Sequence, residues 1–243
     1  PRVQDPYSLR CAAMVLCAVV DLFDELRRRA HSELQAVTDN PLVFDNGDIV
    51  SGGNFHGMPV ALPLDTLALG VAHLAGIAER RTYHMVSSFD EESHLSPFLS
   101  PSPGLHSGYM IAQYAAAAAC NEIAQLATPA SVYNLSTCAG MEDYNSFGPR
   151  SAAKARRAVE LCERVIAIEL MCAAQALDAH RPLRSGEAVE CAHAVVREVV
   201  EPLVADRSPS PDIEAIARRI DEGAFVCIVE NAEARTSEAG GQL

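Results

Sequence analysis

Helical periodicity sustained over unusually long stretches is the feature that most constrains this chain. Apolar residues recur at three- and four-residue spacing through four segments of roughly 20 to 30 residues, at about 5–37, 59–84, 105–126 and 148–180. Two shorter helical patterns follow, at about 185–204 and 211–221. Helices this long bury their apolar faces poorly in a lone chain of 243 residues. The pattern therefore predicts an all-α, long-helix bundle that is shared between subunits.

The third long segment is apolar on nearly every side. Glu122 is its only charged residue, so we expect this helix to be buried all round. Residues 95–121 carry no charge and are long enough to raise the possibility of a membrane span. Prolines, glycines and polar residues interrupt the stretch, so it reads as a loop followed by a buried helix.

One short segment departs from the helical pattern. Residues 42–44 and 49–50 are apolar and flank Asn46-Gly47, which predicts a small β-hairpin with this dipeptide at its tip. Residues 231–243 are small and polar, and we expect a flexible tail there. We otherwise expect residues 1–243 to form a single helical domain.

Charge and cysteine usage exclude several classes of protein. A formal charge of −13 argues against a nucleic-acid partner and against docking on an anionic membrane, because both need a basic face. The eight cysteines have no CxxC spacing and fall mostly in apolar stretches, which predicts buried free thiols in a reducing cytoplasm. No zinc-ligand spacing links the histidines and cysteines, so no metal site is expected. His56, His84, His94 and His106 read as packing or surface residues.

The first segment whose residues could bind a ligand or take part in a reaction is residues 4–10. Asp5-Pro6 signals a helix start, and Gln4, Tyr7 and Arg10 are spaced three apart, which places them on one side of it. An arginine can bind a carboxylate through two hydrogen bonds, and a helix N-terminus adds a positive field. The sequence thus offers a receptor for a small carboxylate, and the alternative is a helix cap with a surface arginine.

Two further segments are unusual for a plain bundle. In residues 51–57, glycines allow close approach to a ligand and Phe55 could form a pocket wall; a hairpin-to-helix connector is the alternative. In residues 141–148, Glu142 could accept a hydrogen bond from a basic ring or move a proton. There the alternative is a helix cap formed by Asp143 or Ser146.

These segments, in this order, resemble the aromatic amino acid ammonia-lyase family, and within it the histidine-specific members. The resemblance covers nearly the whole chain. The matching motifs are VQDPYSLR at 3–10, VTDNPLVF at 37–44, SGGNFHG at 51–57, GLHSGYMIAQ at 104–113, ATPAS at 127–131 and MEDYNSFG at 141–148.

The resemblance implies a fold, an activity and a prosthetic group. Family members eliminate ammonia from an aromatic L-amino acid and leave an α,β-unsaturated acid. Their electrophile is a methylidene-imidazolone (MIO), which forms by self-cyclisation of an Ala-Ser-Gly tripeptide. They assemble as tetramers whose long helices form a shared central bundle of the ammonia-lyase/fumarase type, and each active site draws on three subunits.

The resemblance also assigns roles to matching residues. Arg10 resembles the residue that binds the substrate carboxylate, while Tyr7 and Gln4 resemble active-site groups beside the prosthetic ring, Tyr7 with a catalytic role. Phe55 resembles the aromatic residue near that ring. Glu142 occupies a catalytic and substrate-binding position where histidine-specific members carry Glu and phenylalanine-specific members usually carry Gln. The implied reaction is therefore the conversion of histidine to urocanate.

The departures from the family pattern set the alternatives. The chain has no Ala-Ser-Gly and no counterpart of the segment that supplies the family's tyrosine base. We therefore expect it to correspond to the C-terminal half, which forms no MIO alone and needs an N-terminal half or partner chain. An aminomutase of the same family and an inactive scaffold or regulatory partner of a complete lyase remain alternatives. Other departures lie at Met58, His106, Met141 and Tyr144.

Overall fold

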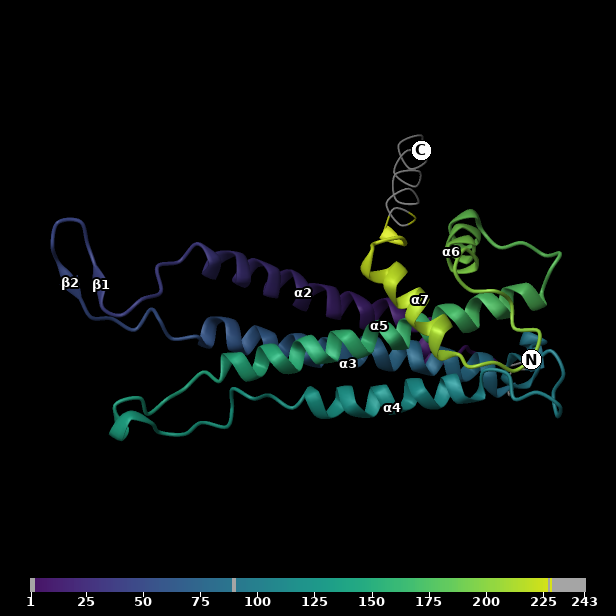
Figure 1. The fold of residues 1–243 in the computed structure, drawn as a ribbon, viewed down its shortest axis with the longest axis horizontal. Coiled ribbons are helices and arrows are strands. Elements are labelled where there is room, and N and C mark those ends of the chain that lie inside the picture. Colours follow the sequence, from purple (N-terminus) through teal and green to yellow (C-terminus); the bar gives the residue numbers. More distant parts are fainter. Residues whose placement is uncertain (1–2, 89–90, 227, 229–243) are drawn as a thin grey trace. The chain divides into compact units, whose positions relative to one another are not determined.

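The chain folds almost entirely as helices, as the sequence predicts. The computed structural model describes residues 3–88, 91–226 and 228 (Figure 1). The expected tail at 231–243 lies outside the described residues. The elements are α1 (Tyr7–Arg10), α2 (Ala12–Leu34), β1 (Leu42–Val43), β2 (Ile49–Val50), α3 (Met58–Ser87), α4 (Met110–Leu126), α5 (Gly148–Ala179), α6 (Glu187–Arg197) and α7 (Ser210–Asp221), with 3₁₀ turns at Glu91–Ser93, Pro97–Leu99 and Cys138–Gly140.

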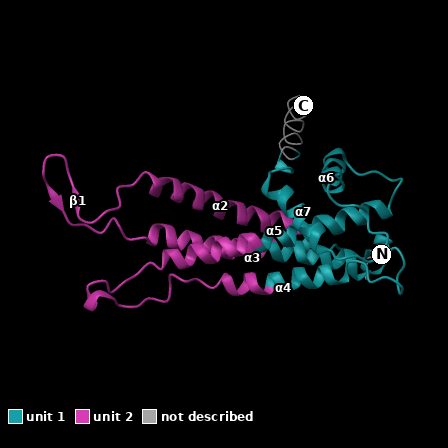
Figure 2. Cartoon of the chain, in the orientation of Figure 1, with its two compact units in different colours: residues 1–10, 75–120, 161–243 teal, residues 11–74, 121–160 magenta. Residues whose placement is uncertain are grey.

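The chain divides into two compact units, coloured separately in Figure 2. Unit 1 comprises Pro1–Arg10, Ala75–Cys120 and Leu161–Leu243, and unit 2 comprises Cys11–Leu74 and Asn121–Glu160. Helices α3, α4 and α5 each contribute residues to both units. That residues 1–243 form a single domain stays a prediction.

Unit 2 contains the predicted hairpin and a tightly packed helix pair. Strands β1 and β2 pair antiparallel, with Leu42 opposite Val50, and Gly47 at the tip has a φ of +88°. Asn46 does not have a positive φ, and the Gly47 amide donates to the carbonyl oxygen of Phe44 at 2.9 Å, so the tip is a type I turn followed by a left-handed glycine and not a two-residue turn. Helices α2 and α3 pack closely at Gly70, where an added Cβ would lie 3.5 Å from the side chains of Val19 and Phe23.

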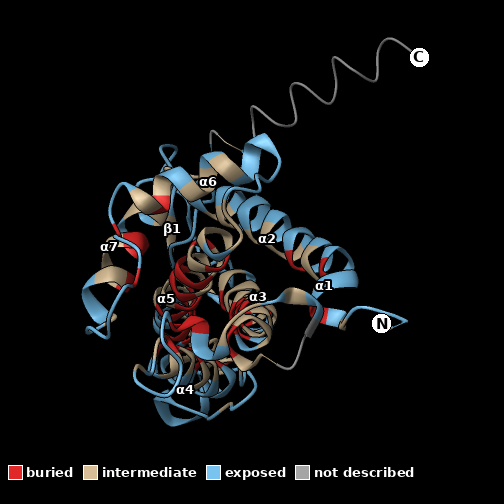
Figure 3. Ribbon diagram, turned by 90° about the vertical axis from the view of Figure 1, so that its right-hand side faces the viewer, coloured by how far each residue is buried: buried red, intermediate tan, exposed pale blue. Residues whose placement is uncertain are grey.

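In unit 1, hydrogen bonds and an ion pair connect the helices in addition to an apolar core. Figure 3 shows the buried residues gathered on the inward faces of α3, α4 and α5. The Gln113 side chain of α4 donates a hydrogen bond of 2.8 Å to the buried Glu79 carboxylate of α3. The Arg81 guanidinium of α3 pairs with Glu169 of α5. By length and composition alone, helix α3 is long and apolar enough to cross a membrane. Glu79 and Arg81 nevertheless lie on this helix, and each contacts a polar side chain of another helix.

The structure corrects the N-terminal helix prediction. Instead of one helix over about 5–37, the chain forms the single turn α1 and then α2, with Cys11 between them at φ −107° and ψ 0°. Apolar periodicity continues across this residue, so the pattern carries no sign of the break.

Helix α4 differs from the prediction in its start and in its burial. It begins at Met110 rather than near 105, because Gly108 has a φ of +58° and the Tyr109 amide donates to the carbonyl oxygen of Phe98. All-round burial is wrong for the described chain, since Ile111 and Tyr114 are exposed. The described residues cover only the stripe of α4 that faces α3 and α5, so its other side has no neighbour among them.

The cysteines are only partly buried. Cys162 and Cys172 are buried free thiols as predicted, but Cys17, Cys138 and Cys191 are exposed. Cys17 and Cys191 lie on outward faces of α2 and α6, and Cys138 lies in a 3₁₀ turn, where local sequence gives little sign of burial. Cys227 lies outside the described residues.

Candidate functional site

The structure brings Gln4, Tyr7 and Arg10 together in unit 1. The Arg10 Nε donates to the carbonyl oxygen of Asp5 at 2.8 Å, and its Nη2 donates to Gln4 Oε1 at 2.7 Å. The guanidinium carbon lies 4.5 Å from the centre of the Tyr7 ring, which is a cation–π contact. These contacts hold the guanidinium in one orientation while leaving its Nη1 group without a partner among the described residues.

The expected contribution of a helix N-terminus is corrected here. Helix α1 has only four residues, so few peptide dipoles align and the positive field is small. Arg10 is exposed, and Tyr7 is 69% exposed. Recognition of a carboxylate by this cluster therefore depends on the charge and the planar geometry of the guanidinium.

Glu142 lies in unit 2, on a tight loop stabilised by its own backbone. Residues Thr137 and Glu142 form an isolated antiparallel bridge, and the Thr137 hydroxyl donates to Glu142 Oε2 at 2.9 Å. The Asn145 side chain closes the loop through the carbonyl oxygen of Leu135, at 2.7 Å. Glu142 is exposed, and these contacts set the direction of its carboxylate.

The structure also contains a contact of the helix-cap type, which was the alternative interpretation of residues 141–148. The Ser146 hydroxyl accepts a hydrogen bond of 3.4 Å from the amide of Gly148, where α5 begins. Ser146 also lies next to Gly57, where an added Cβ would come within 2.9 Å of the Ser146 Oγ. A side chain at position 57 would therefore displace the Ser146 hydroxyl from its present position.

His56 joins the two segments, although the sequence assigned it only a packing or surface role. Its Nε2 donates to the carbonyl oxygen of Tyr144 at 2.8 Å, and its Nδ1 accepts from the Met58 amide at 3.3 Å. A carbonyl oxygen only accepts and an amide N–H only donates, so these partners assign a neutral ring with its proton on Nε2. The imidazole also stacks on the Tyr144 ring, with centroids 6.5 Å apart. No local signal could reveal a contact across 88 residues.

The predicted site residues thus fall into two groups. Unit 1 holds Gln4, Tyr7 and Arg10, and unit 2 holds Phe55 and Glu142 on segments that His56 connects. Phe55 is 52% exposed. The first group can bind a carboxylate, and the second offers a hydrogen-bond acceptor for a basic ring beside an aromatic side chain. No cluster of three metal-ligating side chains occurs among the described residues.

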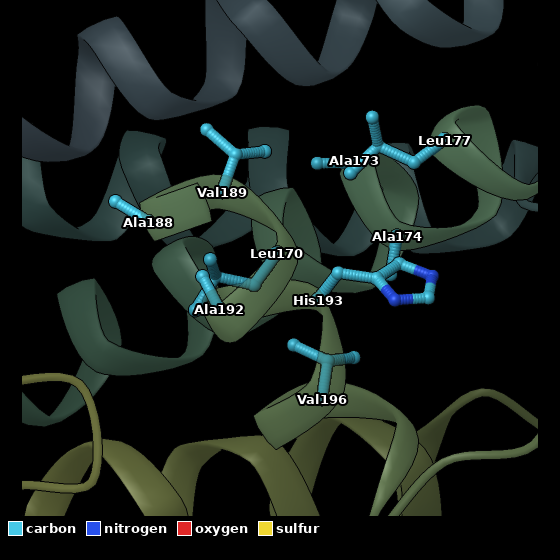
Figure 4. Close-up of a pocket in the computed structure, with 9 residues that line it drawn as sticks. All are labelled: Leu170, Ala173, Ala174, Leu177, Ala188, Val189, Ala192, His193 and Val196. Atoms are coloured by element: carbon cyan, nitrogen blue, oxygen red, sulfur yellow. The ribbon is translucent and has the colours of Figure 1, made fainter. Parts of the chain in front are cut away.

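A pocket in unit 1 has fewer polar groups available to a ligand than the predicted site residues provide. It has a volume of about 240 Å³ and lies between α5 and α6 (Figure 4). Its lining is aliphatic apart from His193, whose Nε2 donates to Asp178 at 2.7 Å. Arg197 also donates to Asp178, at 2.9 Å. Because this carboxylate fixes the imidazole, the pocket lacks a free polar group to orient a ligand.

Comparison with known proteins agrees with these motifs. The family model described as aromatic amino acid lyase matches residues 1–198. The chain is 51% identical over 225 residues to a histidine ammonia-lyase of Anaeromyxobacter dehalogenans (strain 2CP-C), covering 92% of this chain and 44% of that protein. The chain therefore spans less than half the length of this relative.

Solved structures give the same result for the fold. A histidine ammonia-lyase from Trypanosoma cruzi is similar at a TM-score of 0.89 and 42% identity, covering 94% of this chain and 45% of that chain. A tyrosine aminomutase from Streptomyces globisporus is similar at a TM-score of 0.88 and 33% identity, covering 95% and 44%. With the family model matched over most of the chain, the chain belongs to the aromatic amino acid lyase family.

Proposed function

We propose that this chain is the C-terminal part of an MIO-dependent ammonia-lyase that converts histidine to urocanate. The observation that carries the proposal is the Arg10 guanidinium, held by Asp5 and Gln4 above the Tyr7 ring with one amino group free. The identity of 51% to a histidine ammonia-lyase and the carboxylate at Glu142 favour histidine within the family.

In this proposal the chain's residues bind and orient the substrate. Arg10 binds the substrate carboxylate through its free edge, and the Tyr7 phenol lies beside it to hydrogen-bond the reacting end. In unit 2, Glu142 accepts a hydrogen bond from an imidazole N–H, and this would select histidine among aromatic amino acids. Phe55, also in unit 2, offers an exposed aromatic face on which a flat ring can pack.

The donor set also fits the prosthetic group of the family. Gln4 and Tyr7 in unit 1 offer an exposed amide and phenol, and Phe55 in unit 2 offers an exposed aromatic ring. Each of these groups is able to contact a flat, neutral heterocycle by hydrogen bonding or stacking. When bound, the MIO group supplies the electrophile for loss of ammonia. Since the chain has no Ala-Ser-Gly, we propose that another segment or chain supplies it.

A shared helix bundle forms part of the same proposal. Ile111 and Tyr114 on α4, and Met14 and Val20 on α2, are large apolar residues that the described chain leaves exposed. Large apolar side chains exposed near one another, as Ile111 and Tyr114 are one helical turn apart, commonly mark an interface. We propose that these faces pack against other subunits in an oligomer, which would also supply the remaining parts of each active site.

The test is reconstitution with the N-terminal segment and measurement of urocanate formation from histidine. Arg10→Ala is expected to cost about 1.5–3 kcal/mol of substrate binding, on the order of a 10- to 100-fold rise in KM, since it removes a charged hydrogen-bond partner. Arg10→Lys keeps the positive charge but loses the planar guanidinium that can form two hydrogen bonds to one carboxylate, so we expect an intermediate effect. Arg156→Gln is the matched control, because Arg156 is an exposed arginine that pairs with Glu160 on the surface of α5.

Three further results would refute the assigned role or favour one of the alternatives. Near-normal turnover by Arg10→Ala would refute the assigned role. Formation of a β-amino acid would favour the aminomutase, which the similarity to a tyrosine aminomutase at 33% identity makes worth assaying. Complete inactivity of the reconstituted protein would favour the scaffold. Glu142→Gln is expected to weaken histidine turnover relative to phenylalanine.

A further inference from the structure

A second pocket, in unit 2, lies outside the proposed lyase site. It has a volume of about 440 Å³, within the range of small-molecule sites. None of the predicted substrate-binding or catalytic residues lines it. Its lining residues are Gln125, Thr128, Pro129, Ala130, Tyr133, Leu135, Phe147, Arg150 and Lys154.

Lys154 is the unusual member of this lining. It is 7% exposed, and its Nζ donates to the carbonyl oxygen of Thr128, just beyond the end of α4. In the described part of the chain, no carboxylate lies within ion-pair distance of it. A helix C-terminus supplies only a partial negative charge, and one carbonyl uses one of the three ammonium donors. A buried ammonium in this setting is stabilised by an anion.

Arg150 adds a second positive charge to the same pocket. It lies in the first turn of α5, where the helix dipole is also positive, and its guanidinium has no side-chain partner among the described residues. Two acidic residues of the same unit, Asp65 and Glu122, form hydrogen bonds or ion pairs with other groups. Asp65 accepts the Ser131 amide at 2.9 Å, and Glu122 pairs with Arg157 at 2.8 Å.

The rest of the lining is suited to a flat apolar body. Tyr133, Leu135 and Phe147 contribute aromatic and aliphatic side chains, and Pro129 contributes a rigid ring. We propose that this pocket binds a small organic carboxylate that carries an aromatic or apolar group. The carboxylate lies between Arg150 and Lys154, and the apolar group packs against Phe147 and Leu135.

Equilibrium dialysis of the purified protein with radiolabelled benzoate tests this proposal. Benzamide, which has the same shape and no charge, is the matched ligand control. Lys154→Met keeps the length of the side chain and is expected to weaken benzoate binding at least ~10-fold, with a smaller loss for Arg150→Gln. Arg156→Gln, on the same helix and outside the pocket, is expected to leave binding unchanged.

Thermal unfolding separates a ligand-binding lysine from a structural one. If Lys154 binds an anion, Lys154→Met in the absence of benzoate unfolds at or above the wild-type temperature, because an apolar side chain replaces a buried charge. Benzoate then raises the unfolding temperature of the wild type and not of the variant. If Lys154 only caps α4, the variant unfolds at a lower temperature and benzoate stabilises neither protein, which would overturn the proposal.

Three other results would also overturn it. The first is equal binding of benzoate and benzamide, and the second is benzoate binding that Lys154→Met does not change. The third is loss of the oligomer in Lys154→Met without any benzoate binding by the wild type, which would place a carboxylate side chain of a second copy in the pocket. None of these results depends on lyase activity.

Discussion

Asp65 stabilises unit 2 by accepting hydrogen bonds from the loop that follows α4, and its removal gives the sharpest stability prediction. The residue is 4% exposed, and it accepts backbone hydrogen bonds from Ser131, at 2.9 Å, and Ala130. Asp65→Ala leaves these two donors unsatisfied next to a small cavity. A hydrogen bond to a charged group contributes about 1.5–3 kcal/mol, so we expect a loss of roughly 3–5 kcal/mol. Asp65→Asn keeps the shape and one acceptor oxygen, and is expected to cost about 1–2 kcal/mol.

The pH dependence of this loss follows from the pKa of Asp65. Burial raises the pKa of the carboxyl group, but the hydrogen bonds from Ser131 and Ala130 lower it more, so the pKa lies below its usual value of 3.8. A lowered pKa in the folded state stabilises the protein fully above the unfolded pKa, and this stabilisation is lost as the pH falls through the folded value. The difference between wild type and Asp65→Asn is therefore constant near neutral pH and shrinks below about pH 4.

Urea unfolding followed by far-ultraviolet circular dichroism is the appropriate assay, since the chain has no Trp. Asp24→Ala is the matched control, because Asp24 is an exposed acid on α2 in the same unit. We expect the control to change stability by less than about 0.5 kcal/mol. If Asp65→Ala costs no more than the control, the carboxylate does not hold the loop and the reasoning fails.

Two other substitutions and one control test the packing of unit 1. Gly108→Ala is expected to lower the free energy of unfolding in urea by about 2–4 kcal/mol, because φ is +58° and the new Cβ would overlap the carbonyl oxygen of Phe98. The control is Gly76→Ala, where the new Cβ meets open space within α3. It is expected to be neutral or to stabilise the protein by up to about 1 kcal/mol. Arg81→Met is expected to cost about 2–3 kcal/mol at neutral pH, because it leaves Glu169 partly buried without its cation. Burial raises the pKa of Glu169 and Arg81 lowers it, so this loss should shrink on acidification; a pH-independent loss would contradict the assignment.

The long helices could be predicted from the sequence because each carries its own periodic apolar stripe. The bounds of α3 and α5 differ from the predicted ones by three residues or fewer, and the hairpin follows from Asn46-Gly47. The starts of α2 and α4 were missed because they depend on backbone geometry at Cys11 and Gly108, which periodicity does not report. Burial was overestimated because composition gives the apolarity of a helix and not the side on which its neighbours lie.

The candidate site was predictable where its residues are close in sequence. Three-residue spacing was enough to place Gln4, Tyr7 and Arg10 together, since one helical turn and the residues before it span that distance. The bridge from His56 to Tyr144 was not predictable, because a lone histidine gives no sign of a carbonyl 88 residues away. Local motifs therefore indicate candidate residues, and only the tertiary structure shows which contacts hold their side chains.

The exposure of Arg10 bears directly on how the proposed site could work. An ion pair between exposed groups contributes only about 0–1 kcal/mol, so Arg10 in water would bind a carboxylate weakly. The contacts to Asp5, Gln4 and Tyr7 lower the entropic cost of binding, because they fix the guanidinium before a ligand arrives. They do not exclude water from it. Useful affinity therefore requires further polypeptide to cover this surface, and the neighbour that the proposed reaction needs for its electrophile would also strengthen the binding of its substrate.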